Sequence, residues 1–88
     1  MLRKEIEITN KTGLHARPAA TFVQTAAKFK SNVTIEKDTK KANAKSMLAV
    51  LALGVSKDSE IKITAEGEDE NHAVKTLKEL VESKFGEE

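Results

Sequence analysis

The spacing of apolar residues changes along this chain, and that change limits the folds open to it. Ile6 and Ile8 alternate with charged residues, which is the period of a strand with one face in water. From Ala16 the period lengthens to that of an amphipathic helix of about three to four turns. Its apolar stripe consists of Ala19, Phe22, Val23, Ala26 and Phe29. A chain that switches between these periods is expected to pack helices against a sheet.

The rest of the chain continues to alternate between segments with the period of a strand and segments with the period of a helix. Segments 33–36 and 41–44 flank a polar turn and predict a short hairpin. Ser46 opens a short apolar helix that ends at Gly54, a residue suited to the left-handed position after a helix. Segment 60–65 alternates again as the last strand, and Gly67 ends it. The final helix starts among acidic residues, and its apolar stripe is Val74, Leu77, Val81 and Phe85.

The predicted element order is therefore βαββαβα. Half-exposed strands and amphipathic helices together indicate an α+β fold, a two-layer sandwich whose helices cover one face of the sheet. At 88 residues the chain is long enough for one modest core and too short for two. We expect residues 1–88 to form a single domain.

Composition narrows the function. The chain has no cysteine, which excludes disulfides, thiolate chemistry and cysteine-ligated metals and fits a cytoplasmic protein. The charged opening segment 1–10 has no apolar stretch of a signal sequence, so we expect the mature chain to start at Met1. The longest apolar run, 47–53, is far shorter than the roughly 18 residues of a membrane span. A net charge of +1 without Trp or Tyr argues against a nucleic-acid binder.

The segment TGLHARPAA, residues 12–20, contains the residues best suited to a chemically reactive site. Gly13 permits backbone geometry that other residues resist, and the fixed φ of Pro18 suits a first helical turn. Together they predict that His15 stands at a helix N-terminus, where backbone N–H groups without helical partners attract anions. Arg17 adds a permanent cation with forked donors. An imidazole in this setting can act as a nucleophile toward phosphorus and then pass the phosphoryl group on.

Other interpretations of His15 are weaker on the residues present. A histidine at a helix start is often only solvated or capping. A metal site is disfavoured, because the other histidine is His72 and no carboxylate accompanies His15 at ligand spacing. An independent phosphatase is disfavoured too, because the motif holds no carboxylate to serve as general acid. We expect neither a metal nor a cofactor.

With these residues the chain resembles the HPr family, the histidine-containing phosphocarriers of the bacterial phosphoenolpyruvate:sugar phosphotransferase system. The resemblance covers the whole length and is carried by GLHARPAA at 13–20, NAKSMLAVLALG at 43–54 and ITAEGEDE at 63–70. It implies an open-faced β-sandwich of four antiparallel strands covered by three helices. It further implies that His15 takes phosphate on Nδ1 from enzyme I and delivers it to IIA domains of sugar permeases. Arg17 would contact the phosphoryl group, and the carrier would act as a monomer.

Ser46 forms a second candidate site. Serine is a preferred N-cap residue, and we expect Ser46 to cap the helix that follows it. A phosphate at this position would also be favoured by the helix dipole. In the Gram-positive branch of the resembled family, HPr kinase/phosphorylase modifies this serine and the product assists a catabolite control protein. Ala16 and Gln24 favour that branch, so regulation at Ser46 is a further expectation.

The helix after Ser46 is apolar almost all round, and only one of its faces can be buried against a sheet. Part of it should therefore remain exposed beside His15 as a docking surface. The first helix adds a stripe of mostly small side chains, offset from its core stripe, that would let a partner approach closely. The predicted docking residues are Ala16, Ala20, Gln24 and Ala27 on the first helix and Met47, Leu48 and Leu51 on the second.

Two alternatives to a phosphocarrier stay open at this point. One is an HPr paralogue with a mainly regulatory or nitrogen-branch role; loss of the acceptor histidine would mark the regulatory kind, and His15 is present. The other is a small binding module in which His15 only caps a helix. The lysines at 37, 40, 41 and 45 are interpreted as a solvated face and, like His72, are assigned no site.

Overall fold

Strands and helices follow one another in the predicted order. The computed structural model describes residues 1–86. The elements are β1 (Leu2–Glu7), α1 (Ala16–Ala26), β2 (Asn32–Lys37), β3 (Lys40–Asn43), α2 (Met47–Ala52), β4 (Glu60–Glu66), α3 (Glu70–Glu82) and a short 3-10 turn, η1 (Lys84–Gly86). This is an open-faced α+β sandwich of four strands and three helices, which confirms the predicted fold class.

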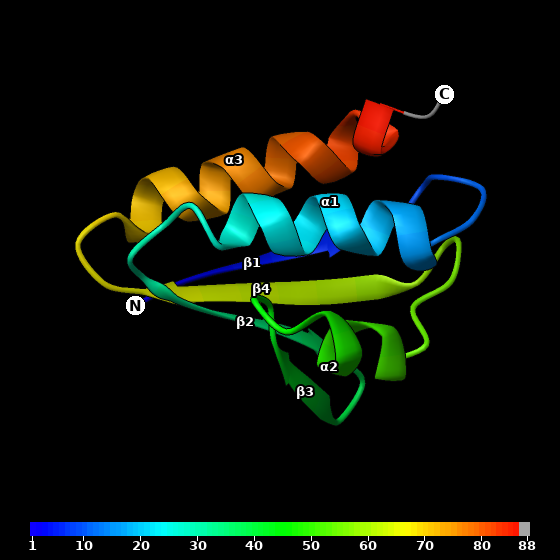
Figure 1. Cartoon of the computed structure of the whole chain (residues 1–88), viewed down its shortest axis with the longest axis horizontal. Helices are drawn as coiled ribbons and strands as arrows, with labels where there is room; N and C mark the ends of the chain where they lie inside the picture. The colour runs from blue at the N-terminus through cyan, green and yellow to red at the C-terminus, as the bar shows by residue number, and fades with distance from the viewer. Residues whose placement is uncertain (87–88) are drawn as a thin grey trace.

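The sheet is antiparallel throughout, with the strand order β1-β4-β2-β3. Its register places Ile6 opposite Ile61 and Ile35 opposite Ile63. These side chains are buried on the face that the helices cover, and α1 and α3 lie side by side there (Figure 1). Burying each large apolar side chain of this core contributes about 1.5–3 kcal/mol. The alternate residues form a polar open face, on which Arg3 pairs with Glu36 at 3.2 Å.

The first helix ends earlier than its apolar stripe predicts. The stripe predicts a helix that includes Phe29, but α1 ends at Ala26 and Phe29 lies beyond it, half-buried against the core. Lys28 and Phe29 already bond carbonyls three positions back, and the carboxylate of Asp69 at the start of α3 then accepts the backbone N–H groups of Lys30 at 2.8 Å and Ser31 at 2.9 Å. Because these donors bind Asp69, they are not available to continue the helix.

Phe85 also lies outside the helix predicted for it. The last helix ends at Glu82, and Ser83 donates its hydroxyl to the Leu80 carbonyl at 2.9 Å. Lys84 and Phe85 then adopt left-handed φ values of 57° and 58°, which turn the chain. Phe85 is nevertheless buried, so its place in the core was correct and its helical conformation was wrong.

Two of the lysines interpreted as a solvated face make specific contacts. Lys37 donates its Nζ to the Gly54 carbonyl at 2.9 Å, just after the end of α2. Lys45 donates its Nζ to the Phe29 carbonyl at 2.8 Å, just after the end of α1. Cations stabilise the carbonyl ends of helices, so both contacts help to hold the two helices in place.

The bridge from Asp69 to the end of α1 generates a pH-dependent prediction. Hydrogen bonds, first from the Ser31 hydroxyl and then from the Lys30 backbone N–H, lower the pKa of Asp69 from 3.8 to about 2. Because the folded-state pKa is below the unfolded value, the stabilisation is complete above about pH 4 and is lost as the pH falls toward 2. Asp69→Asn should therefore lower the melting temperature at pH 7, and the difference from the unmodified protein should shrink as the pH approaches 2.

Thermal denaturation followed by circular dichroism from pH 2 to pH 7 measures this difference. Glu68→Gln removes an exposed carboxylate from the neighbouring position and is the matched control. A destabilisation by Asp69→Asn that is the same at pH 2 and pH 7 would contradict the assignment of the stabilising charge to Asp69.

Candidate functional site

The loop before α1 is held against the loop that follows α2. Gly13 has a φ of 60°, and a Cβ there would lie 2.6 Å from both the Val55 carbonyl oxygen and the Ser56 Cα. The next residue, Leu14, donates its backbone N–H to the Val55 carbonyl at 3.0 Å. Only glycine combines this backbone conformation with such a close approach. The contact places the residue after Leu14 beside the end of α2.

That residue is His15, which is the N-cap of α1 as predicted. Its backbone is extended, with φ −75° and ψ −174°, and its carbonyl accepts the Ala19 N–H at 2.8 Å. The side chain makes no capping hydrogen bond and is exposed. The ring is thus held at the start of the helix by the backbone alone and stays accessible to a partner, which removes the interpretation of His15 as a simple capping side chain.

Arg17 lies in the first turn of α1, and its side chain is exposed as well. No acidic residue occupies that turn, so the positive end of the helix is not neutralised by the helix's own side chains. This end of α1 therefore combines an imidazole, a guanidinium and a helix N-terminus, a set suited to a phosphoryl group.

His15 borders a shallow hollow of about 300 Å³ between the N-terminus of α1 and the end of α2. Its lining comes from both segments and consists of Leu14, His15, Ala16, Leu51, Gly54, Val55 and Ser56. A group attached to the imidazole would therefore lie next to α2.

Ser46 caps α2, as predicted. Its Oγ accepts the backbone N–H of Ala49 at 3.3 Å, and the residue is half-buried. At 3.3 Å the bond is longer than the usual range for an N–H···O bond, so the hydroxyl is only weakly bonded.

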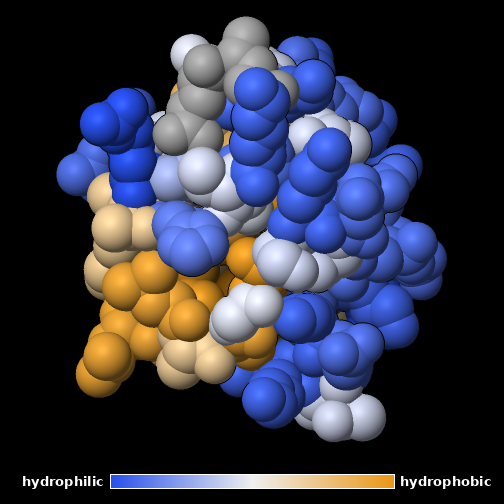
Figure 2. All heavy atoms as spheres, turned by 90° about the vertical axis from the view of Figure 1, so that its right-hand side faces the viewer, coloured by the Kyte–Doolittle hydropathy of each residue, from blue (hydrophilic) through white to orange (hydrophobic). Residues whose placement is uncertain are grey.

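The predicted docking residues share one exposed surface. On α2 the side chain of Val50 is buried in the core, whereas Leu48 is 82% exposed and Leu51 is 38% exposed. Figure 2 shows apolar side chains gathered on one part of the molecule, in contrast to the hydrophilic surface around them. We define the apolar patch as the exposed or half-exposed Met47, Leu48 and Leu51 of α2 with Ala16, Ala20 and Ala27 of α1. The predicted docking residue Gln24 is also exposed on α1, but its side chain is polar. The contacts between α1 and α2 bring the two sets together.

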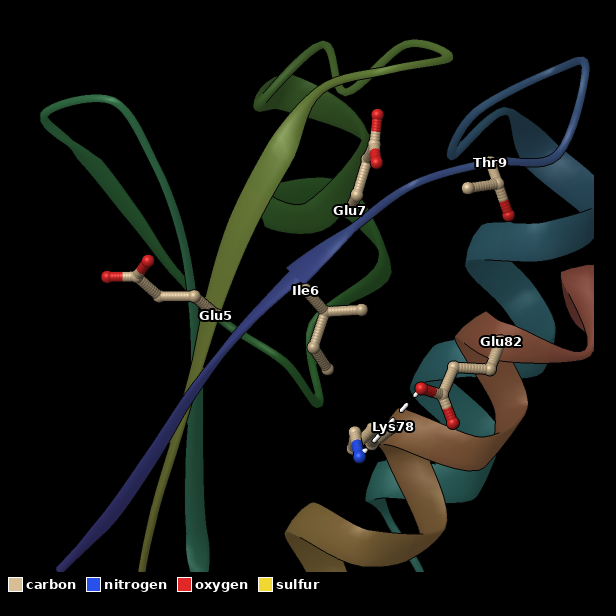
Figure 3. Close-up of a pocket in the computed structure, with 6 residues that line it drawn as sticks. All are labelled: Glu5, Ile6, Glu7, Thr9, Lys78 and Glu82. Atoms are coloured by element: carbon tan, nitrogen blue, oxygen red, sulfur yellow. Dashed lines mark ion pairs between the residues drawn. The ribbon is translucent and has the colours of Figure 1, made fainter.

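A second hollow, of about 370 Å³, lies between β1 and α3. Lys78 and Glu82 of α3 pair there at 3.8 Å, whereas the carboxylates of Glu5 and Glu7 point away from them (Figure 3).

Residues 1–86 contain no group of His, Cys, Asp and Glu side chains arranged to hold a metal ion. No helix within that range is long and apolar enough to cross a membrane. His72 lies in the first turn of α3, and its ring meets that of Phe29 edge-on at 5.1 Å.

Known proteins share the sequence and the fold of this chain. A family model described as "PTS HPr component phosphorylation site" matches residues 2–83. The phosphocarrier protein HPr of Xylella fastidiosa (strain Temecula1) is 44% identical over 88 residues, covering 100% of this chain and 99% of that protein. HPr-C-His from Thermoanaerobacter tengcongensis is 60% identical, with a TM-score of 0.98 over 100% of this chain and 99% of that one. The Bacillus subtilis protein Crh, described as a dimer with a swapping domain, is 46% identical, with a TM-score of 0.76 over 96% and 97% of the two chains.

The chain therefore belongs to the HPr family of phosphocarrier proteins of the phosphotransferase system. This confirms the family resemblance that the motifs at 13–20, 43–54 and 63–70 indicate.

Two contributors to the site are not indicated directly by the sequence. Asn10 is fully buried in the loop before His15, and the segment Val55–Ser56 supports that loop from the other side. The spacing of Asn10 and Gly13 is typical of a tight turn, and this signal could have identified the first of them. The second depends on a contact between residues about forty positions apart, which no local pattern reveals.

A pair of glycines tests whether the loop contact is needed. Gly13 and Gly54 have similar φ values, 60° and 66°, but a Cβ would meet no atom within 4 Å at Gly54. Gly54→Ala should cost about 1–2 kcal/mol for the left-handed backbone alone. Gly13→Ala should cost at least about 1 kcal/mol more, because the methyl group collides with backbone that must move. Urea denaturation measures both losses; equal losses would show that the contact is not a tight one.

Proposed function

We propose that His15 is the residue through which this phosphocarrier receives and donates phosphate. The observation that carries the proposal is the exposed imidazole at the start of α1, held by backbone contacts and free of a capping bond. The other histidine, His72, lies in the first turn of α3, where the carboxylates of Asp69 and Glu70 would repel a phosphate, and its ring packs against Phe29. Resemblance to the family adds that Nδ1 is the bonded atom.

The transfer is an exchange of one nitrogen–phosphorus bond for another. The lone pair of a neutral imidazole attacks the phosphorus of the donor, the bond to the donor nitrogen breaks, and its electron pair returns to the donor ring. The proposed transfer requires no oxidant and no cofactor. Helix N–H groups and the Arg17 guanidinium would stabilise the charge on the phosphoryl oxygens as it moves. Partner enzymes supply and remove the group, so we regard the chain as a carrier and not as an enzyme.

The proposed donor is enzyme I, and the proposed acceptors are IIA domains of sugar permeases. Both would dock on the apolar patch, because it lies next to His15 and presents Leu48 at 82% exposure. Small side chains such as Ala16 and Ala20 allow a partner to come close to the ring. One surface would thus serve successive partners, which a carrier requires because donor and acceptor bind in turn.

We further propose that this chain acts as a cytoplasmic monomer. A chain without cysteine suits a reducing compartment, and the resemblance to the family implies a carrier that acts alone. Dimers are the competing assemblies, since Crh is described as a swapped dimer and one Thermoanaerobacter tengcongensis structure as an HPr dimer. Sedimentation equilibrium distinguishes the two, since a monomer has a mass of 9.6 kDa.

A mainly regulatory role is the second candidate, and Ser46 is the observation that favours it. Its loosely engaged hydroxyl at the start of α2 would accept phosphate from an HPr kinase/phosphorylase. The modified protein would then assist a catabolite control protein, in keeping with the catabolite-repression role in the description of Crh. The presence of His15 favours transfer as the main activity and regulation as an additional one.

Labelling tests the acceptor. Incubated with enzyme I and labelled phosphoenolpyruvate, the unmodified protein should acquire one acid-labile, base-stable phosphate. His15→Gln should abolish labelling, whereas the matched variant His72→Gln should label normally. In the same assay Arg17→Lys, which keeps the charge without the fork, should slow transfer less than Arg17→Ala. Labelling of the His15→Gln protein would refute the assignment.

A charge at Ser46 tests the docking surface. Phosphate adds about −1.5 to −2 charge beside the apolar patch, and a partner would have to desolvate that charge to bind. The helix dipole should tolerate it, so unfolding is not the expected route of inhibition. Ser46→Asp should keep the thermal stability of the unmodified protein while raising the concentration of enzyme I needed for half-maximal phosphorylation about tenfold, or about 1.4 kcal/mol. Normal binding with slow transfer would instead place the effect in the chemistry at His15.

A further inference from the structure

Asn10 is a buried polar side chain in the loop that carries His15. It is 0% exposed. Its Nδ2 donates to the Gly13 carbonyl at 2.8 Å and to the Thr12 hydroxyl at 3.3 Å, and the Asn10 backbone carbonyl accepts the Gly13 N–H at 3.2 Å. Burying a primary amide is costly unless it is hydrogen-bonded, so this side chain is a specific feature of the loop and not a generic filler.

These bonds control one peptide plane. The Gly13 carbonyl and the Leu14 N–H belong to the same planar peptide unit and point in opposite directions. Asn10 holds the carbonyl on one side at 2.8 Å, and Val55 holds the N–H on the other at 3.0 Å. The plane is therefore held at both ends. Only Leu14 stands between this peptide plane and His15. The orientation of the plane therefore sets the direction in which the chain enters α1.

We infer that Asn10 is a positioning residue for His15, acting through the Gly13–Leu14 peptide. The inference rests on the proposed function of His15. Without the amide donor the peptide can rotate, the contact of Leu14 with Val55 loosens, and the imidazole loses its fixed place beside the helix N-terminus. A misplacement of about 1 Å at a reacting group can slow a reaction by about a hundredfold. The apolar patch lies outside this loop, so partner binding should not change.

Asn10→Asp is the most direct test, because it preserves the shape and replaces the donor by a carboxylate that repels the Gly13 carbonyl. The rate of phosphorylation at saturating enzyme I should fall at least about tenfold, and the concentration of enzyme I for half-maximal rate should stay within about twofold. Ser31→Ala is the matched control, since Ser31 is also a buried polar residue but lies beyond the other end of α1. It should lower stability and leave the saturating rate unchanged.

A measurement on the unphosphorylated protein separates this inference from the proposed function. In Asn10→Asp the Leu14 amide should exchange with solvent at least about tenfold faster, and the ring signals of His15 should shift in NMR spectra, whereas Ser31→Ala should change neither. If Asn10→Asp does not fold, Asn10→Ala removes the donor without adding charge and carries the same expectations.

Two results would overturn the inference. One is an unchanged saturating rate with a higher requirement for enzyme I, which would mean that the loop serves docking. The other is unchanged Leu14 exchange and unchanged His15 signals in a folded variant. Labelling of His15→Gln, by contrast, would refute the proposed function and leave the structural readouts on Leu14 to decide the role of Asn10.

Discussion

The architecture of the site depends on the backbone contact between Gly13 and the segment Val55–Ser56. A methyl group at Gly13 would come within 2.6 Å of two backbone atoms, so the two loops touch as closely as backbones can. One loop leads into α1 and the other leaves α2. Their contact therefore sets the N-terminus of one helix beside the C-terminal end of the other, and it makes a single surface out of two short segments of sequence.

Other contacts hold the C-terminal ends of these helices. Lys37 binds the Gly54 carbonyl after α2, and Lys45 binds the Phe29 carbonyl after α1. Asp69 ties the chain after α1 to the start of α3. These bonds are polar and lie near the surface, whereas the core between helices and sheet is apolar. The core positions the helices on the sheet, and the polar bonds determine where each helix ends.

The sequence predicted what local chemistry determines. Gly13 and Pro18 act through neighbouring backbone, so the position of His15 at a helix start followed from the motif itself. The exposed face of α2 followed from a helix too apolar for one buried side. Periodicity could not show where the chain turns, and it therefore extended α1 to Phe29 and α3 to Phe85. Those ends depend on Asp69, which is 38 positions from Ser31, and on left-handed backbone at Lys84.

The central claim is that this backbone framework presents one ring nitrogen of His15 for phosphorylation, and coupling between ¹⁵N and ³¹P tests it most directly. The protein is labelled with ¹⁵N in its histidines, phosphorylated by enzyme I and phosphoenolpyruvate, and examined at alkaline pH, where the bond is stable. The account predicts a single one-bond coupling of phosphorus, to Nδ1 of His15. A coupling to either nitrogen of His72, or to Nε2 of His15, would contradict it.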